Sequence, residues 1–454
     1  MPIEATFPYN VLEQMCVELD GRQADLMKLA EYHAGRHRLA FASSKFREAF
    51  GGLFSSFADN FIPLVVNAVA ERLIVQGFRY GDDPKADKDA TAFWQANNLD
   101  AGAQLAIKQA LIKGDSYVIV WGDSDGMPKV SVETPNQVIV AYAPGDRTQR
   151  VAALKRWQDS AGKHAVLFLP GGVFRFLWTE ANNGTWMPEP GFSFPAPNPL
   201  GVVPVVPLVN DPSLDSPYGL SEFVGVIPLQ DIINKLVADM IVASEYVAYP
   251  QRYVTGLELP EDDQGRTVAP YQFAVDKFLV AEEAGAKFGT LAAGDLSNHI
   301  KEIETMVQHI STQTRTPPHY FNVGGNLPSG DAIKAAETGL VAKARSKMVY
   351  FGEAWEEVIR LCFKVTGDPR GDVMNAETIW TNPEYRSDSE LADALVKRAA
   401  IGVPKEQLWE DAGYTQAQIS RFRAMAIADQ FDNVFANQPV GIPKLAPVKI
   451  TTVE

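Results

Sequence analysis

The sequence predicts an α+β fold that is mostly helical and contains one antiparallel β module. Apolar residues recur at helical spacing through much of the first 113 residues. Short β-branched runs, separated by glycine- and proline-rich turns, then occupy 115–210. Helical spacing returns near Tyr218 and dominates the remainder of the chain. Strands gathered in one region, with helices on both sides of it, are typical of α+β proteins.

Composition and charge restrict the function. The 454 residues are 46% hydrophobic and 21% charged, so the chain can bury a core and is not typical of a disordered protein. The formal net charge of −15 comes from 41 basic and 56 acidic residues, a balance that repels nucleic acid at long range. A sequence-reading DNA-binding protein is disfavoured, because such proteins gain affinity from basic patches that displace counterions.

The cysteines and the N-terminus predict a soluble protein made in a reducing compartment. The sequence contains only Cys16 and Cys362, which excludes a disulfide framework, and each is expected to be a small apolar core residue. Residues 1–10 lack a basic stretch followed by an apolar run, and no run of 18 apolar residues occurs. We therefore expect no signal peptide and no membrane span, with synthesis in the cytoplasm.

Three helices are predicted before and at the entrance to the β module. Residues 8–34 carry an apolar stripe, and so do residues 59–73, where Pro63 suits the first turn. A third helix is predicted over about 89–113 and is stopped by Gly114. The predicted strands that follow are 116–121, 129–133, 137–142, 151–157, 164–169, 173–178 and 202–208.

Two further helices enclose an acidic segment. One helix is predicted over about 218–249 and ends before Pro250, which disfavours helical backbone in the preceding residue. Residues 250–296 are strand-rich and contain eight acidic and four basic residues, a net charge of −4. A second amphipathic helix is predicted over 297–315 and ends at Pro317.

A very long helix is predicted after a loop of glycine, asparagine and proline at 319–330. Ser329 can cap this helix, which runs over 331–366 and would span ~54 Å at 1.5 Å per residue. Residues 387–454 comprise a small helical module and a proline-bearing tail. The predicted buried stripe of the long helix is Ile333, Ala336, Leu340, Ala344, Met348, Phe351, Trp355, Val358 or Ile359, and Cys362.

Short motifs give no catalytic site. The GNLPSG stretch has the glycine spacing of a phosphate loop, but Asp331 follows where lysine is required, and its carboxylate would repel a phosphate. His33 and His37 share a helical face without further zinc ligands. Ser124 lies in GDSDG, but a strand follows it, so a hairpin turn is favoured over a nucleophile elbow. We predict no catalytic residue, no cofactor and no metal.

The order of the elements is more specific than any motif, and it resembles the portal protein family of tailed double-stranded-DNA bacteriophages, in the branch typical of siphophages. Three passages carry the resemblance: 32–79, beginning YHAGRHRLAF; 218–256, beginning YGLSEFVGVIPLQD; and 314–348, beginning TRTPPHYFNVGGNLPSGD. The resemblance extends over nearly the whole chain and implies a mostly helical portal fold with wing, stem, clip and crown.

The resemblance implies a non-enzymatic subunit of a dodecameric ring at one capsid vertex, through which double-stranded DNA is packaged and ejected. The implied partners are further copies of the chain, the terminase large subunit, a head–tail adaptor, the major capsid and scaffolding proteins, and DNA bound without sequence specificity. A membrane is not among them. The implied location is the virion, with the host cytoplasm during assembly.

Family parts are placed on this chain by the resemblance. They are the wing at 1–216, a first stem helix at 217–249, a small mixed α/β clip at 250–296, a second stem helix at 297–316, the tunnel loop at 317–330, the long helix and return to the wing at 331–386, and the crown and tail at 387–454. The implied DNA-facing residues are Asn322, Gly324, Gly325, Asn326 and Ser329, which are flexible or uncharged. The implied docking surface of the clip is Glu258, Glu261, Asp262, Asp263, Glu282 and Glu283.

Two other functions remain open at this point. The chain could be another phage structural subunit, a capsid or adaptor protein, and its assembly would then lack a central channel. It could also be an enzyme with an unrecognised site, marked by a deep pocket with convergent polar groups. The basic and aromatic residues of 36–50 could bind nucleic acid, although an amphipathic surface or a subunit contact is favoured.

Overall fold

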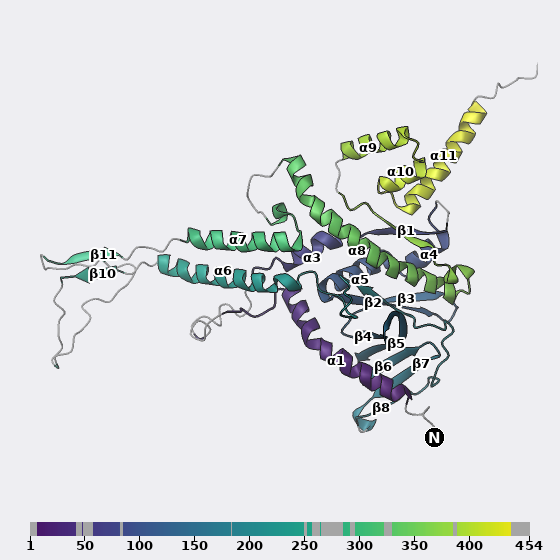
Figure 1. Ribbon diagram of the computed structural model, residues 1–454, viewed down its shortest axis with the longest axis horizontal. Coiled ribbons are helices and arrows are strands. Elements are labelled where there is room, and N and C mark those ends of the chain that lie inside the picture. The colour runs from purple at the N-terminus through teal and green to yellow at the C-terminus, as the bar shows by residue number, and fades with distance from the viewer. Residues whose placement is uncertain are drawn as a thin grey trace, which may run out of the picture.

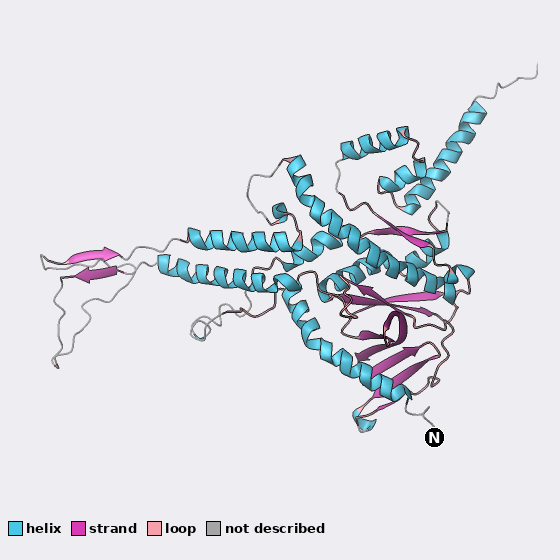
Figure 2. Cartoon of the chain, viewed as in Figure 1, coloured by secondary structure: helices cyan, strands magenta, loops and turns pink. Residues whose placement is uncertain are grey.

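A body of helices and sheets carries a pair of helices that projects from one side (Figure 1). This arrangement is seen in a computed structural model of the chain. The structure describes residues 7–41, 48, 58–81, 85–182, 184–248, 252–256, 264, 285–290, 296–321, 329–384 and 388–436. Helices and antiparallel sheets are both present, and the helices pack around the sheets (Figure 2), so the predicted α+β class is confirmed.

The β module consists of two antiparallel sheets. The larger has the order β4-β5-β6-β7-β8, and its strands are β4 (Val138–Ala143), β5 (Asp146–Gln158), β6 (Lys163–Leu169), β7 (Gly172–Trp178) and β8 (Trp186–Pro188). The smaller has the order β3-β2-β9, from β3 (Pro128–Glu133), β2 (Asp115–Gly122) and β9 (Val205–Val209). Alternate side chains of the larger sheet point to opposite faces, so each face supports a separate apolar cluster.

Helix α1 (Phe7–His33) covers one face of the larger sheet. Its stripe of Leu12, Met15, Cys16 and Leu19 is buried against sheet residues that include Leu154. The opposite face packs on the smaller sheet through side chains such as Ile119, Val140, Phe168 and Val205. The larger sheet is therefore sandwiched between a helix and a second sheet, which explains the apolar runs of β4 and β6 and the buried Ala152, Ala153 and Leu154 within β5.

The largest core surrounds the long helix α8 (Gly330–Val365). Helices α3 (Ile62–Ala70), α4 (Lys88–Ala96) and α5 (Leu99–Lys113) contribute to it. Trp355 is fully buried and meets Trp94 edge-on, with ring centres 5.1 Å apart. The predicted stripe of α8 is buried from Leu340 onward, but Ala336 is exposed and Ile333 is only half-buried, because the first two turns extend beyond the body.

A small two-stranded sheet joins distant parts of the chain. Strand β1 (Val75–Tyr80) pairs antiparallel with β12 (Ala376–Trp380), which follows the short helix η5 (Pro369–Asp372). The C-terminal helices come next and are α9 (Asp388–Ala400), α10 (Lys405–Asp411) and α11 (Gln416–Ala436). An ion pair of 2.7 Å between Arg79 and Glu410 connects this sheet to α10. Neither strand was predicted, since each needs its remote partner to complete its hydrogen bonds.

Two predicted helices require correction. The helix expected over 89–113 is broken into α4 and α5, because Asn98 adopts left-handed backbone at φ 53°. The helix expected from Tyr218 begins at Ile227, as α6 (Ile227–Ala248), after the short helix η3 (Val224–Val226). The residues that precede α6 have irregular backbone because they pack closely against the end of α5. A Cβ atom on Gly114, whose φ is +90°, would lie only 2.3 Å from the Gly219 carbonyl oxygen.

Trp355 provides a test of the core. Trp355→Ala is expected to lower the free energy of unfolding by ~3–5 kcal/mol, because it leaves a large cavity. Trp355→Phe should cost only about 1–2 kcal/mol, because the buried indole N–H has no hydrogen-bond partner within the described structure and its loss is not penalised. Urea unfolding measures both changes, with Met374→Ala, at an exposed position, as the control. Equal losses for alanine and phenylalanine would contradict this packing.

Candidate functional site: a projecting helix pair and its anchors

Helices α6 and α7 (Ser297–Thr314) form the most prominent feature of the molecule. They lie side by side and point away from the body, toward the ribbon of β10 (Arg252–Thr255) and β11 (Lys287–Thr290) (Figure 1). At 1.5 Å per residue, α6 is about 33 Å long and α7 about 27 Å long. The pair therefore extends well beyond the core that supports it.

The helix pair is covered by protein only at its base. Ile233 and Ile310 are buried where the helices meet the body, and Ala238 is buried halfway along α6. Ile303 and Met306, farther along α7, are half-buried, and Ile300 near its start is 49% exposed. Two helices cannot enclose an apolar stripe on every side, so an isolated chain leaves an apolar flank along the pair.

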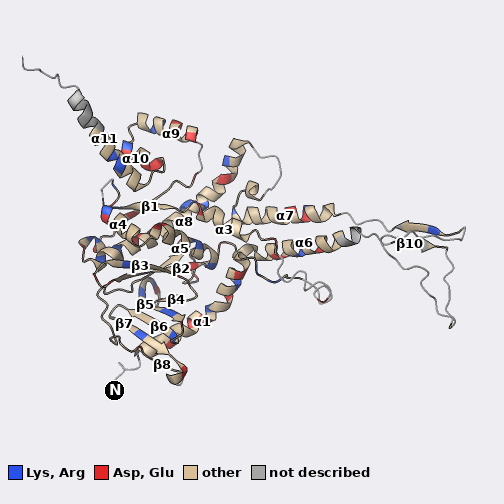
Figure 3. Ribbon diagram, turned by 180° about the vertical axis from the view of Figure 1, so that it is seen from behind, with Lys and Arg blue, Asp and Glu red and all other residues tan. Residues whose placement is uncertain are grey.

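The helix pair carries little positive charge. Its sequence contains two lysines, Lys235 and Lys301, against five acidic residues, and Figure 3 shows the charged residues scattered along the ribbon of the pair, without a run of basic ones. Lys235 is moreover paired with Asp239 one turn away on the same helix. A surface of this kind does not hold a DNA backbone tightly, because tight binding requires clustered cations.

The base of α6 is held by buried polar side chains. The Phe61 backbone N–H donates to Gln230 Oε1 at 3.0 Å, and the Tyr32 hydroxyl donates to both Asp231 oxygens at 2.9 and 3.0 Å. Asn234 Oδ1 accepts the Asp59 backbone N–H at 2.9 Å. These bonds join α6 to α1 and to the segment leading into α3, so they fix the direction in which the pair leaves the body.

His37 completes this anchor in its neutral form. Its ring stacks on Tyr32 with centres 4.2 Å apart, and its Nε2 accepts a hydrogen bond of 2.7 Å from Asn234 Nδ2. Burial lowers the pKa of His37, although the carboxylates of Asp231 and Glu31 oppose the shift. Protonation would place an N–H of the imidazolium against the amide N–H of Asn234, because Asn234 Oδ1 is already engaged by Asp59.

A second anchor fixes α8 to the base of the pair, next to the segment before α6 and to the end of α7. The Glu222 carboxylate lies 2.7 Å from Lys343 Nζ and 2.7 Å from Lys347 Nζ, and the three side chains are 7%, 13% and 8% exposed. Lys343 also donates to the Thr314 carbonyl at the end of α7, and Lys347 donates to Asn210. Burial alone would raise the pKa of Glu222, but the two lysines hold it below its usual value.

The third anchor holds the two ends of the 317–330 loop. Tyr320, in the short helix η4 (Pro318–Tyr320), accepts a hydrogen bond of 2.8 Å from Arg72 and donates one of 3.2 Å to Glu337 on α8. Arg72 and Glu337 are themselves 3.3 Å apart. At the other end, the Ser329 side chain accepts from the Ala332 N–H and caps α8, as predicted. Both ends of the loop therefore start from rigid elements.

Most of the predicted site residues lie outside the described part of the chain. Of the tunnel-loop set, this applies to Asn322, Gly324, Gly325 and Asn326, while Ser329 is described as the cap of α8. The whole predicted docking set, Glu258, Glu261, Asp262, Asp263, Glu282 and Glu283, also lies outside it. The anchors themselves were missed by sequence reasoning, although polar Gln230, Asp231 and Asn234 interrupting an apolar helix were a usable signal.

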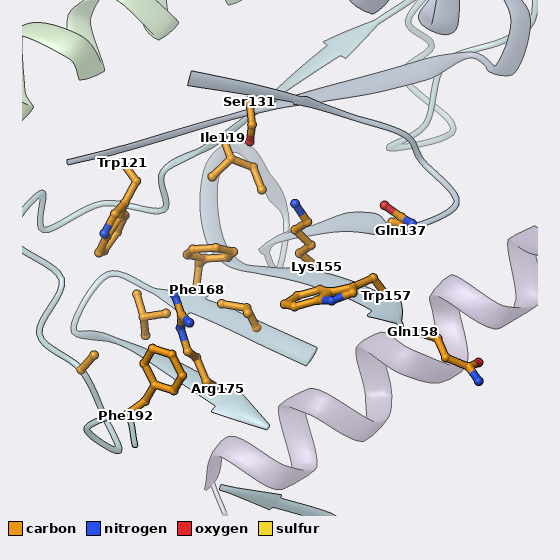
Figure 4. A pocket seen from close by; sticks show the side chains of 13 residues that line it. Ile119, Trp121, Ser131, Gln137, Lys155, Trp157, Gln158, Phe168, Arg175 and Phe192 are labelled. Atoms are coloured by element: carbon orange, nitrogen blue, oxygen red, sulfur yellow. The ribbon is translucent and has the colours of Figure 1, made fainter. Parts of the chain in front are cut away.

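A cavity of about 620 Å³ lies between the two sheets of the β module (Figure 4), and no histidine, cysteine or carboxylate lines it. Within the ranges described, no cluster of three histidine, cysteine or acidic residues could hold a metal ion. None of the helices in those ranges has the length and apolar character needed to cross a membrane.

Comparison with known families identifies the chain. The family described as phage portal protein, SPP1 Gp6-like, matches residues 57–429, a range that runs from just before α3 to within α11. The helix pair, the anchor residues Asp59, Phe61 and Arg72 on either side of α3 and the anchor residues of α8 fall inside the match, whereas Tyr32 and His37 precede it. The matched part therefore belongs to a structural component of a phage particle. The chain belongs to the phage portal protein family, in its SPP1 Gp6-like group, as its resemblance predicted. Membership places it in the virion.

Two curated relatives support the same assignment. The portal protein of Mycobacterium phage D29 is 31% identical over 384 residues, which cover 79% of this chain and 77% of that one. The portal protein of Mycobacterium phage L5 is 30% identical over 384 residues, covering 79% and 76%. The similarity therefore extends over most of each protein and is not confined to one module.

Solved structures of gene transfer agent particles contain chains of distantly similar fold. One from the neck of an empty particle, computed with C6 symmetry, aligns over 82% of this chain and 92% of that one, with 14% identity and a TM-score of 0.47. One from the neck of a native particle, computed with C12 symmetry, covers 85% and 97%, with 14% identity and a TM-score of 0.44. At these scores the likeness identifies no function.

The Glu222 anchor gives a stability prediction. Glu222→Ala should lower the free energy of unfolding by ~3–5 kcal/mol, because it leaves Lys343 and Lys347 buried without their carboxylate. The matched control is Asp393→Asn, which removes the partner of exposed Lys397 on α9 and should cost at most about 0.5 kcal/mol. Thermal and urea unfolding measure both. Similar losses for the two variants would show that the Glu222 cluster is solvated.

The His37 anchor gives a pH prediction. Because its folded pKa is depressed, the unfolded state binds more protons than the folded state as the pH falls below about 6.5. Stability from this residue is therefore present at neutral pH and is lost on acidification. The melting temperature of the wild type should fall more between pH 7.5 and 5.5 than that of His37→Gln, which cannot titrate there. Parallel pH profiles for the two proteins would contradict the prediction.

Proposed function

We propose that this portal subunit assembles into a dodecameric ring in which the α6–α7 pairs surround a central channel for double-stranded DNA. The observation that carries the proposal is the apolar flank that a single chain leaves along its projecting helices. Neighbouring copies around a ring would bury this flank, as coiled-coil neighbours bury apolar seams. The scarcity of lysine on the pair suits a channel through which DNA slides.

The parts of the portal fold are proposed with the structural boundaries. The stem is α6 and α7, and the clip is 250–296, which contains β10 and β11. The wing is 1–216, with its helices and the β module, together with the C-terminal half of α8. The tunnel loop is 317–330 and the crown is α9 to α11. The two ends of the proposed tunnel loop are held by Arg72, which follows α3, and by α8, so we expect that changes within the loop leave the ring intact.

The proposed partners follow from these parts. The clip, with Glu258, Glu261, Asp262, Asp263, Glu282 and Glu283, is the docking surface for the terminase large subunit and then for the head–tail adaptor. The wing faces the major capsid and scaffolding proteins. ATP hydrolysis belongs to the terminase, and we assign no catalysis to this chain. Assembly takes place in the host cytoplasm, before the ring becomes part of the virion.

Ring formation is the direct test. Negative-stain microscopy of the purified chain, or of portal vertices released from phage heads, should show rings of about a dozen subunits with a central hole. Native mass spectrometry should give the matching mass. A compact dimer, or a closed assembly without a hole, would rule out the portal arrangement and favour a capsid or adaptor subunit.

The tunnel loop has a separate prediction. Deleting Asn322–Asn326 should leave rings intact but sharply reduce packaged or retained DNA, because the loop no longer reaches the channel axis. Replacing the same five residues with Gly-Ser-Gly-Ser-Gly keeps the loop length and should restore most of the function. DNA content per particle, measured by nuclease protection, distinguishes these outcomes. Full packaging by the deletion variant would show that the loop does not contact DNA.

A further inference from the structure

The cavity between the two sheets of the β module lies apart from the helix pair that is proposed to surround the DNA channel. Its volume of about 620 Å³ lies in the range of sites that hold drug-sized ligands. Strands β2, β3, β5, β6 and β7 form its walls, together with the segment after β8 (Figure 4). The pocket lies within the β module, and none of its lining residues belongs to the anchors of the helix pair.

Aromatic rings dominate the pocket. Trp121 and Phe168 lie with ring centres 6.2 Å apart, and Trp157 and Phe192 contribute further rings. Phe192 is 49% exposed, so part of this aromatic surface remains open to solvent. Exposed aromatic surface inside a concave site favours a ligand with an apolar side chain, because covering the rings removes them from water.

The charge of the pocket is opposite to that of the chain. The protein carries a net charge of −15, yet the lining includes Lys155 and Arg175 and no acidic residue. Lys155 is already neutralised by Glu133, whose carboxylate lies 2.5 Å from its Nζ. Arg175 stacks on Phe192 at 4.0 Å from the ring centre and, among the residues described, pairs with no carboxylate. A stacked guanidinium keeps its N–H edge available for a carboxylate.

We propose that this pocket, the Arg175 pocket, binds an acidic peptide segment of a partner protein. An aromatic or long aliphatic side chain of the peptide inserts between the rings, and a neighbouring carboxylate pairs with Arg175. A small polar metabolite fits less well, because most of the lining is apolar. Of its polar side chains, Lys155 is paired with Glu133 and the Ser131 hydroxyl donates to Glu133 at 2.9 Å, which leaves the Gln137 and Gln158 amides beside Arg175. Aromatic residues and arginine are the side chains that dominate protein-binding surfaces.

A peptide-binding experiment on the full chain tests the proposal. The probe is a fluorescein-labelled peptide, GSEDWEDLGS, compared by fluorescence anisotropy with GSKRWKRLGS and with GSEDSEDSGS. Only the first should bind saturably, because it alone combines carboxylates with apolar side chains. Arg175→Gln should weaken its binding roughly tenfold or more, the value of a charged hydrogen bond. Arg175→Lys should retain part of the affinity, because lysine keeps the positive charge but lacks the planar guanidinium that can donate two parallel hydrogen bonds to a carboxylate.

Two further variants separate the pocket from general charge and folding. Lys88→Gln removes one exposed positive charge from α4, outside the pocket, and should leave binding unchanged. Ser131→Trp fills the pocket from the smaller sheet and should abolish binding while the melting temperature stays near that of the wild type. Equal binding of all three peptides, no binding up to millimolar concentration, or full affinity in Arg175→Gln overturns the proposal. Self-association that is lost in Ser131→Trp would also overturn it, by assigning the pocket to a second copy of the chain.

Discussion

The burial of Glu222 between Lys343 and Lys347 is the constraint on which the arrangement of the molecule depends. Removing three charges from water is costly, and the cost is offset only when each lysine meets the carboxylate in the correct geometry. A shift of α8 along its axis would leave at least one charge buried alone. The cluster therefore sets the register of α8 against the segment before α6 and, through the Thr314 carbonyl, against the end of α7.

The direction of the helix pair follows from this register. With α8 fixed, the polar bonds of Gln230, Asp231 and Asn234 determine how α6 leaves the body, and α7 returns to the same base. The base of the pair is held rigidly, and the rest of its length presents an apolar flank. The flank is therefore already oriented for contact with a neighbouring subunit before the ring forms. A net charge of −15 opposes the approach of another copy, and apolar burial along the pair offsets that repulsion.

The β module is packed less completely than the helical core. Its larger sheet is covered by α1 on one face and by the smaller sheet on the other, and the second interface is incompletely filled. The residues around the gap come from separated strands, and no local motif marks them. The same separation explains why the pocket and the polar anchors escaped sequence analysis, whereas the long helix, its cap at Ser329 and the apolar stripes did not.

The sequence by itself determined the α+β class, the helices α1, α7 and α8 and most strands of the β module, because these depend on local periodicity and capping. The order of these elements, with three longer passages, carried the resemblance to the portal family. The tertiary structure decided the pairing of β1 with β12 and the start of α6 at Ile227. It also decided which charges meet in the core. These features arise from contacts between residues tens to hundreds of positions apart, and a single sequence carries no record of such distances.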